Sequence, residues 1–328
     1  MAVSNFRPWA IFTGYMILAA ALTIKSIAII RSQRKSSLVR SAQDDPGHSA
    51  RRRAVPVFGI LAVVSLATTW YHMFRFFERS YQQWAISHVF AGVGATGGEQ
   101  GLRLGEWLRD TSLFKQAWAS TLETGPRAWW SLQIFGFCAN WSVLLAVQAQ
   151  KRKIPQAWIF VLLGQVVAIS FAANLSFLAI LRSNASCQPS SKDGKGSDTA
   201  RKTVSGSSSM SWYTVVLFLN LLWATSIPSA IGSPGFLALL LGPHLLAFVP
   251  LVLKGILPTR MLGDPTWFFK LASMAWVLAV AFRGIVGLDK GMTIVTKTLY
   301  EHPAVSSVGW DVICCWVSFG AWYFIGVE

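Results

Sequence analysis

The chain has 328 residues, of which 53% are hydrophobic and only 13% are charged, and its mean hydropathy is +0.46. Soluble domains carry about 25% charged residues, so these values exclude an ordinary soluble protein, a disordered chain and a coiled coil. The net charge of +15 does not indicate a nucleic-acid partner, because the basic residues gather in short connections between apolar stretches. The composition predicts an all-α, polytopic integral membrane helical bundle.

Eight apolar stretches have the length of about 20 residues that a helix needs to cross the hydrocarbon core of a membrane. They cover residues 9–30, 55–74, 128–147, 156–181, 212–231, 235–253, 267–287 and 308–327. No small-residue cleavage site follows the first stretch, so we expect a true span and not a removable signal peptide. The sequence predicts a single membrane domain over 1–328, with about eight transmembrane helices, in a multi-pass protein of the endoplasmic reticulum.

Two strongly basic connections predict the orientation. The loop 31–54 holds seven Lys/Arg, and Lys151-Arg152-Lys153 forms a second basic turn, so both are expected on the cytoplasmic side. With eight spans, the two chain ends and the segment 182–211 fall on the other side. That segment is rich in Ser, Gly and Lys and predicts a flexible polar loop, with a glycosylation sequon at Asn184. Its five basic residues argue against this side.

The segment 75–127 is long and mixed in character. Charged residues alternate there with apolar residues at helical spacing, namely Leu104, Trp107, Leu108, Phe114 and Trp118. This amphipathic pattern is typical of a helix lying in the membrane interface. The segment then either rests on lipid headgroups, which we favour, or covers a site as a lid.

Asp311 is the acidic residue inside a predicted span that no loop explains. It shares a helical face with Cys315, Ser318 and Trp322, so we expect it to point into the bundle. One interpretation is a structural ion pair with a basic residue of another span (Lys25, Lys270 or Arg283). Without such a partner, desolvation keeps the carboxyl uncharged and ready to donate a proton. The second candidate acid is Glu78, for which a surface ion pair with Arg75 or Arg79 is the alternative.

Other polar and aromatic residues inside the predicted spans are candidates for binding a substrate. The amides either form hydrogen bonds between helices or line a cavity, and the deep tryptophans either pack or stabilise a cation with their ring faces. The candidates are Trp70, Tyr71, Gln133, Asn140, Gln165, Asn174, Trp223, His244, Trp310 and Trp316.

Several motifs of metal and cofactor chemistry are missing. The chain contains neither the DDxxD motif of diphosphate-binding magnesium sites nor the DxDD motif of soluble protonating cyclases, and HExxH, GxSxG and P-loop patterns are also missing. We therefore predict no metal and no cofactor, and any enzymatic activity is expected to be acid–base chemistry.

Three stretches resemble a known family. They are Trp129-Trp130-Ser131-Leu132-Gln133, the stretch 163–175 with Gln165 and Asn174, and the stretch 303–311 that ends in Asp311. They are similar to the integral-membrane terpene cyclases of fungal meroterpenoid pathways. The resemblance implies that a lipophilic prenylated aromatic or polyketide substrate, taken from the membrane lipid, is protonated at a terminal epoxide or olefin and closes into rings. Asp311 would match the acid of the last helix and Glu78 an earlier acid.

Two other functions remain open. A proton-coupled transporter of a small lipophilic or cationic solute would use Asp311, Arg283 and His244 as a proton relay, although the sequence lacks the internal repeats that many transporters show. A structural membrane protein without catalytic or transport activity is the third interpretation.

Overall fold

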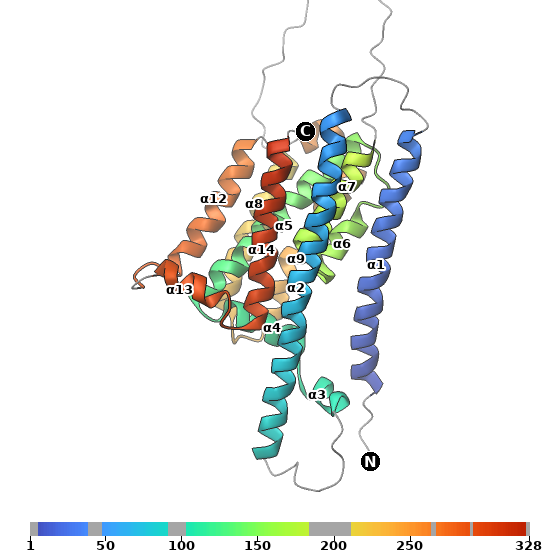
Figure 1. The fold of residues 1–328 in the computed structure, drawn as a ribbon. Helices are drawn as coiled ribbons and strands as arrows, with labels where there is room; N and C mark the ends of the chain where they lie inside the picture. The colour runs from blue at the N-terminus through green and yellow to red at the C-terminus, as the bar shows by residue number, and fades with distance from the viewer. Residues whose placement is uncertain are drawn as a thin grey trace, which may run out of the picture.

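The computed structural model describes residues 6–38, 48–90, 103–183, 211–263, 267–288 and 291–325, and every regular element in these ranges is helical (Figure 1). In chain order the elements are α1 (Phe6–Leu38), α2 (His48–Phe90), α3 (Leu104–Asp110), α4 (Leu113–Leu122), α5 (Gly125–Lys151), α6 (Trp158–Val166), α7 (Ile169–Arg182), α8 (Trp212–Ser226), the 3-10 turn η1 (Ile227–Ala230), α9 (Phe236–Leu246), α10 (Val249–Ile256), α11 (Thr259–Leu262), α12 (Trp267–Arg283), α13 (Gly291–Thr298) and α14 (Pro303–Ile325).

Five helical segments of the described chain are long and apolar enough to cross a membrane: α1, α2, α5, α8 with η1, and α14. A sixth span results if α9 and α10, which meet at a bend of 48°, count as one. The expected all-helical class is therefore confirmed, and the helices suggest a multi-pass membrane protein. The prediction of about eight spans differs from this count in three of the stretches, 156–181, 235–253 and 267–287.

Two of these stretches are interrupted, and the third forms a short helix. The stretch 235–253 is bent into α9 and α10, with Pro243 inside the first helix and Pro250 near the start of the second, and proline removes a backbone donor. The helix α12 has 17 residues, the short end of the range that can cross a membrane. The stretch 156–181 breaks at Val167 and Ala168, and Ala168 has an extended backbone conformation (φ −169°, ψ 140°) that no helix contains.

The helices α6 and α7 form a hairpin that turns back inside the bundle. Arg152, just before α6, donates a hydrogen bond to the carbonyl oxygen of Ile180 near the end of α7 (3.5 Å), so the hairpin begins and ends at the same place. At its tip, the Tyr15 hydroxyl of α1 donates to the carbonyl oxygen of Val166 (2.7 Å). We call the segment Gln165–Ser170 the hairpin tip.

The hairpin changes the expected sidedness. Figure 1 shows α1 beginning at one end of the bundle, the Phe6 end, and α14 finishing at the other, the Ile325 end. The start of α1 and the end of α14 therefore lie at opposite ends of the bundle, in contrast to the predicted arrangement with both on one side, because the hairpin returns where a full span was expected. Arg182 now lies at the Ile325 end, beside the basic turn 151–153 and the end of α1.

Two predicted segment boundaries also change. The helix α2 has 43 residues, or about 65 Å at the α-helical rise, so it continues through the first part of the expected segment 75–127 and projects beyond the bundle at the Phe6 end. Likewise, α1 and α2 extend into the expected loop 31–54. Most of the polar loop 182–211, including the sequon at Asn184, lies outside the described residues.

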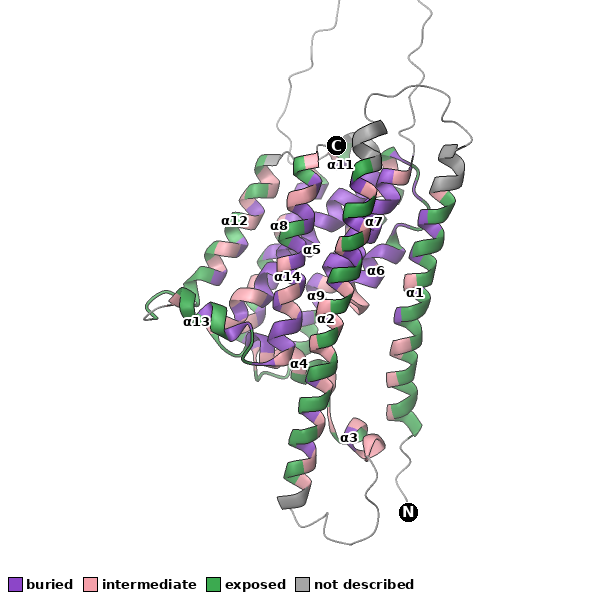
Figure 2. Ribbon diagram, in the orientation of Figure 1, coloured by how far each residue is buried: buried purple, intermediate pink, exposed green. Residues whose placement is uncertain are grey.

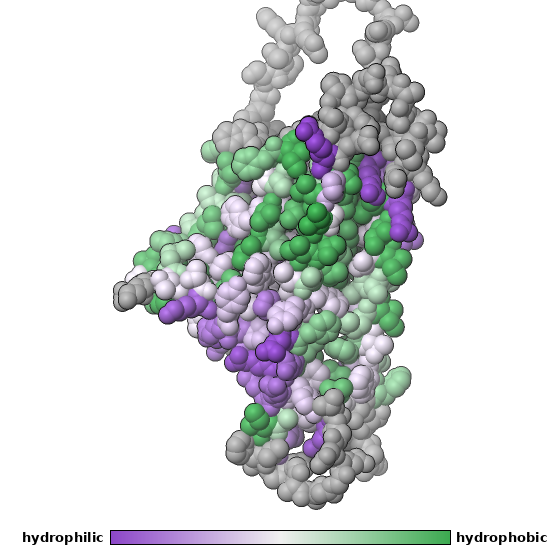
Figure 3. Space-filling view, in the orientation of Figure 1, coloured by the Kyte–Doolittle hydropathy of each residue, from purple (hydrophilic) through white to green (hydrophobic). Residues whose placement is uncertain are grey.

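The buried core lies around α5, with α12, α14 and α8 packed beside it, while α2 packs against α14 and α7 (Figure 2). Toward the Ile325 end, the rings of Phe58, Phe177 and Trp322 fill the space between helices, and the last two stack at 4.5 Å. On the face drawn in Figure 3, hydrophobic side chains dominate toward the Ile325 end, and hydrophilic ones gather toward the Phe6 end. The outward apolar residues of α1 and α2 fit contact with lipid.

Candidate active-site cavity

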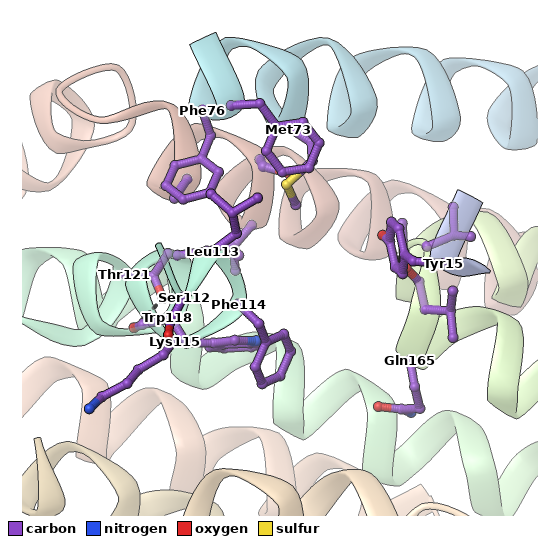
Figure 4. Close-up of a pocket in the computed structure, with 18 of the residues that line it drawn as sticks. Tyr15, Met73, Phe76, Ser112, Leu113, Phe114, Lys115, Trp118, Thr121 and Gln165 are labelled. Atoms are coloured by element: carbon purple, nitrogen blue, oxygen red, sulfur yellow. Dashed lines mark hydrogen bonds between the residues drawn. The ribbon is translucent and has the colours of Figure 1, made fainter. Parts of the chain in front are cut away.

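A cavity of about 880 Å³ lies next to the hairpin tip, on the side of the Phe6 end. Its volume falls within the roughly 300–1,000 Å³ typical of small-molecule sites. Figure 4 shows Tyr15 and Gln165 at one end of the cavity, and Ser112, Trp118 and Thr121 at the other. Most of its wall is apolar, and much of it is aromatic, supplied by Phe12, Phe76, Phe77, Phe114, Trp118 and Phe135.

Asp311 lies on the wall of this cavity and holds the hairpin tip. Its two carboxyl oxygens accept the backbone N–H groups of Ile169 (2.9 Å) and Ser170 (2.8 Å), the first two residues of α7. Ala168 occupies the N-cap position and has no side-chain oxygen to serve these donors. Asp311 therefore caps α7 from another helix, and the positive end of the α7 dipole faces the carboxyl group.

The surroundings of Asp311 decide between its two sequence-based interpretations. The residue is only 7% exposed, and within the described ranges no lysine or arginine forms an ion pair with it. The structural ion pair with Lys25, Lys270 or Arg283 is therefore not formed. Instead, the structure contains a buried carboxyl group that accepts hydrogen bonds from neutral backbone donors and lies beside an open space.

His244 reaches the same cavity from α9, next to Pro243. Its Nδ1 atom pairs with the Oε1 atom of Gln165, whose Nε2 atom donates to the sulfur of Cys138 (3.1 Å). The imidazole ring makes edge contacts with Trp118 (5.6 Å) and Phe135 (5.7 Å). Its Nε2 atom is buried and has no hydrogen-bond partner among the described residues.

The cavity has a basic rim. Arg7 of α1, Arg109 of α3 and Lys115 of α4 line it, while Asp311 is the acidic residue that does so in the described part of the chain. Arg109 is bonded to Asp110 (2.9 Å), and this hydrogen bond lowers the pKa of the Asp110 carboxyl below its usual value. The charge of the cavity is thus divided between a cationic rim and one carboxyl at the hairpin tip.

Part of the amphipathic segment forms one wall. Leu108, Phe114 and Trp118, which the helical spacing grouped together, all line the cavity. This placement favours the interpretation of a lid over the interpretation of a segment that only rests on lipid headgroups.

Most of the other predicted site residues lie elsewhere. Glu78 is on the outside of α2, where it pairs with Arg75 (3.1 Å) and has a half-exposed side chain, so the structure does not bring it to Asp311. Three side-chain amides of the core form hydrogen bonds with residues of other helices. Gln133 accepts a bond from Trp316, Asn140 binds Ser273, and Asn174 binds Ser65.

The remaining tryptophans and Tyr71 are also outside the cavity. Trp223 donates to the carbonyl oxygen of Leu239 (2.9 Å) and is 42% exposed, and Tyr71 is exposed as well. Trp70 packs against Phe74, and neither Trp310 nor Trp316 lines the cavity. Of the predicted site residues, the structure therefore brings Asp311, Gln165 and His244 together.

Several cavity residues were missed from the sequence. Thr69, Met73 and Phe76 recur at helical spacing on α2, so the sequence pattern could have identified them as one face of this helix. Tyr15 is the one tyrosine of the first predicted span, residues 9–30. Cys138 carries no spacing signal, because its role depends on Gln165 of another helix.

No known protein family, curated protein sequence or solved structure matches this chain. In the described ranges, no group of three or more His, Cys, Asp or Glu residues is arranged to hold a metal ion. The fold and cavity define the chain only as a helical, multi-pass membrane protein with a lipophilic internal site.

Proposed function

We propose that the protein is a membrane-bound terpene cyclase that protonates a terminal epoxide or olefin of a prenylated aromatic or polyketide and closes rings without a metal. The observation that carries this proposal is the position of Asp311, a buried carboxyl without a cationic partner in the described ranges, on the wall of a large aromatic cavity. The resemblance of the stretch 303–311 to such cyclases supports the same residue.

The proposed reaction begins at Asp311. Its carboxyl group donates a proton to the terminal epoxide oxygen or alkene carbon of the substrate. In an epoxide the C–O bond breaks as the neighbouring alkene forms the new C–C bond, and a hydroxyl group remains. The N–H groups of Ile169 and Ser170 stabilise the carboxylate that is left behind.

The cavity wall serves the cationic intermediate. The ring faces of Phe76, Trp118 and Phe135 stabilise positive charge through their quadrupoles, and the apolar wall excludes water that would end the reaction early. The cationic rim formed by Arg7 and Lys115 suits a polar or anionic head of the substrate, with the prenyl chain directed toward the hairpin tip.

The basic stretches suggest an orientation for this enzyme. The turn 151–153, the end of α1 and Arg182 all lie at the Ile325 end, which the positive-inside rule places in the cytoplasm. The cavity then lies toward the opposite leaflet, which is the lumenal one if the protein resides in the endoplasmic reticulum. Reporter fusions behind Ile325 should be active on the cytoplasmic side.

The decisive experiment separates the acid from the helix cap. Asp311→Ala removes both, whereas Asp311→Ala combined with Ala168→Ser restores a side-chain oxygen at the N-cap of α7 without restoring an acid. We expect the double variant to regain thermal stability but to form no cyclised product from the terminal epoxide of a farnesyl hydroxybenzoate. Cyclisation by this double variant at the wild-type rate would remove Asp311 from the mechanism.

One observation favours a transporter as the second candidate. The chain breaks a helix beside the cavity, between α6 and α7, and transporters build solute sites from such broken helices. Purified protein in detergent distinguishes the two functions. Product formation there supports the cyclase, while uptake of a solute that occurs only in sealed vesicles supports the transporter.

A further inference from the structure

A cyclisation that starts with a proton must also end with one, because the last carbocation becomes an alkene by losing a proton to a base. This step rests on the proposed function. Glu78, the second candidate acid, does not line the cavity, so it cannot accept that proton. The base must be sought among the polar groups that do face the cavity.

We infer that the Nε2 atom of His244 is this base. Gln165 uses its amide nitrogen on the Cys138 sulfur, so its oxygen faces the Nδ1 atom of His244 as an acceptor. Nδ1 must then carry the hydrogen, and the neutral ring keeps its lone pair on Nε2. The chain from Cys138 to His244 thereby fixes both the orientation of the ring and its tautomer.

The surroundings of Nε2 indicate a role beyond packing. The atom is buried, yet no described residue forms a hydrogen bond with it, and an unpaired buried polar atom costs free energy. None of His72, His88 and His302 lines the cavity: Nδ1 of His302 accepts the N–H of Ala304, and Nε2 of His88 lies 3.6 Å from Asp110. His244 is the one that combines a free nitrogen with a place on the cavity wall.

The acid and the base sit at the two ends of the hairpin tip. Ile169 and Ser170 hold Asp311, and Gln165 holds His244, so one short segment of backbone sets both groups against the same cavity. Trp118 and Phe135 contact the imidazole ring. Aromatic rings therefore lie beside the place where the last carbocation would lose its proton.

The proton balance of the reaction then closes. Asp311 gives a proton to the substrate, the rings form, and a C–H bond next to the last cationic carbon breaks, leaving its electron pair in the new alkene. The proton passes to Nε2 of His244, and the imidazolium returns it to the Asp311 carboxylate through solvent after the product leaves. The net change is an isomerisation of the substrate.

The first test follows the products of His244→Gln, with His88→Gln as a matched control outside the cavity. The probe is the terminal epoxide of a farnesyl hydroxybenzoate. His244→Gln should still consume it, within about tenfold of the wild-type rate, because Asp311 remains. The normal alkene should fall to a minor product, replaced by water-quenched alcohols or alkene isomers. An unchanged product, or a complete loss of consumption with intact fold, would overturn the assignment.

The second test does not depend on turnover. Farnesyl dimethylamine carries a protonated nitrogen that mimics the cation and can donate a hydrogen bond to Nε2, while farnesyl methyl ether is a neutral probe of similar shape that has no hydrogen-bond donor. Wild-type protein should bind the amine at least about tenfold more tightly than His244→Phe does, whereas the ether should bind both alike, since a hydrogen bond to a charged group has about this value. Equal amine affinity in the two proteins would refute the inference.

These tests also keep the inference apart from the proposed function. If wild-type protein does not cyclise the epoxide but His244 still sets the amine affinity, the cyclase proposal fails, while the assignment of an unpaired Nε2 lone pair to His244 remains supported. If the epoxide is cyclised and neither His244 variant changes product or affinity, the cyclase stands and another group is the base.

Discussion

The two halves of α14 lie in different surroundings. Toward the Ile325 end, Trp322 and Phe319 interlock with Phe177 of α7, and Trp322 is fully buried. Toward the Phe6 end, Val308 and Asp311 face an open cavity. The difference arises because α7 accompanies α14 only as far as the hairpin tip, so the space that a complete span would fill remains open below it.

This comparison explains why an acid lies where the packing stops. A helix that begins inside the bundle leaves its first N–H groups without partners, and hydrocarbon cannot supply any. The packed half needs no such compensation, since its helices continue. Asp311 marks the boundary between the halves, and the same carboxyl that completes α7 is the one that faces the cavity.

The largest effect on stability should come from removing the Asp311 carboxyl group. Asp311→Ala leaves two buried N–H groups without an acceptor, at about 1–3 kcal/mol for each. We expect a marked fall in the melting temperature of the purified protein, measured in detergent by differential scanning fluorimetry. Asp311→Asn should lose less, because its amide oxygen still accepts one bond. A melting temperature equal to that of the wild type would show that α7 does not need this cap.

A matched pair of substitutions on α14 should sharpen the comparison. Val312 is fully buried in the packed half, so Val312→Phe should destabilise the protein by about 1–3 kcal/mol through overpacking. Val308→Phe adds the same volume beside the cavity and should leave the melting temperature nearly unchanged.

The same pair should diverge in binding. Val308→Phe should weaken the binding of a farnesyl probe, because its ring occupies cavity space, whereas Val312→Phe should affect binding only as far as it affects folding. Equal destabilisation by both substitutions would mean that the space beside Val308 is already filled.

The start of α14 should respond to pH. His302 is buried, and desolvation lowers its pKa to about 4, assisted by Arg79 and Arg127. Its Nδ1 atom accepts the N–H of Ala304 (3.3 Å), a bond that only the unprotonated nitrogen can form. Because the unfolded chain binds this proton near pH 6.5 and the folded one near 4, stability should fall as the pH drops through this interval.

The effect on melting should be modest, comparable to the roughly 0.5–2 kcal/mol of a helix cap. His302→Gln should flatten the pH dependence between about pH 6.5 and 4. An unchanged slope in His302→Gln would assign the acid sensitivity to other groups.

Much of the fold follows from apolar length alone, but the hairpin does not. The stretch 156–181 has the hydropathy of a span, and Val167 and Ala168 carry no turn signal. The break is stabilised by Asp311 and Tyr15, which lie far away in sequence. The helical periodicity correctly predicted that Asp311 points into the bundle. The side chains of Gln133, Asn140 and Asn174 also point inward, but they form hydrogen bonds with residues of neighbouring helices and do not line the cavity.

The smallest effect is expected at Glu78, and it tests the family resemblance. Its pair with Arg75 is half-exposed, and such surface pairs contribute about 0–1 kcal/mol, so Glu78→Gln should barely change melting. It should also leave cyclisation of the farnesyl epoxide within about twofold of wild type, since the side chain is outside the cavity. Arg75→Gln is the control for losing the pair itself. A selective loss of product in Glu78→Gln would mean that the reaction uses the outer face of α2, and the contrast between the two halves of α14 would no longer locate the active site.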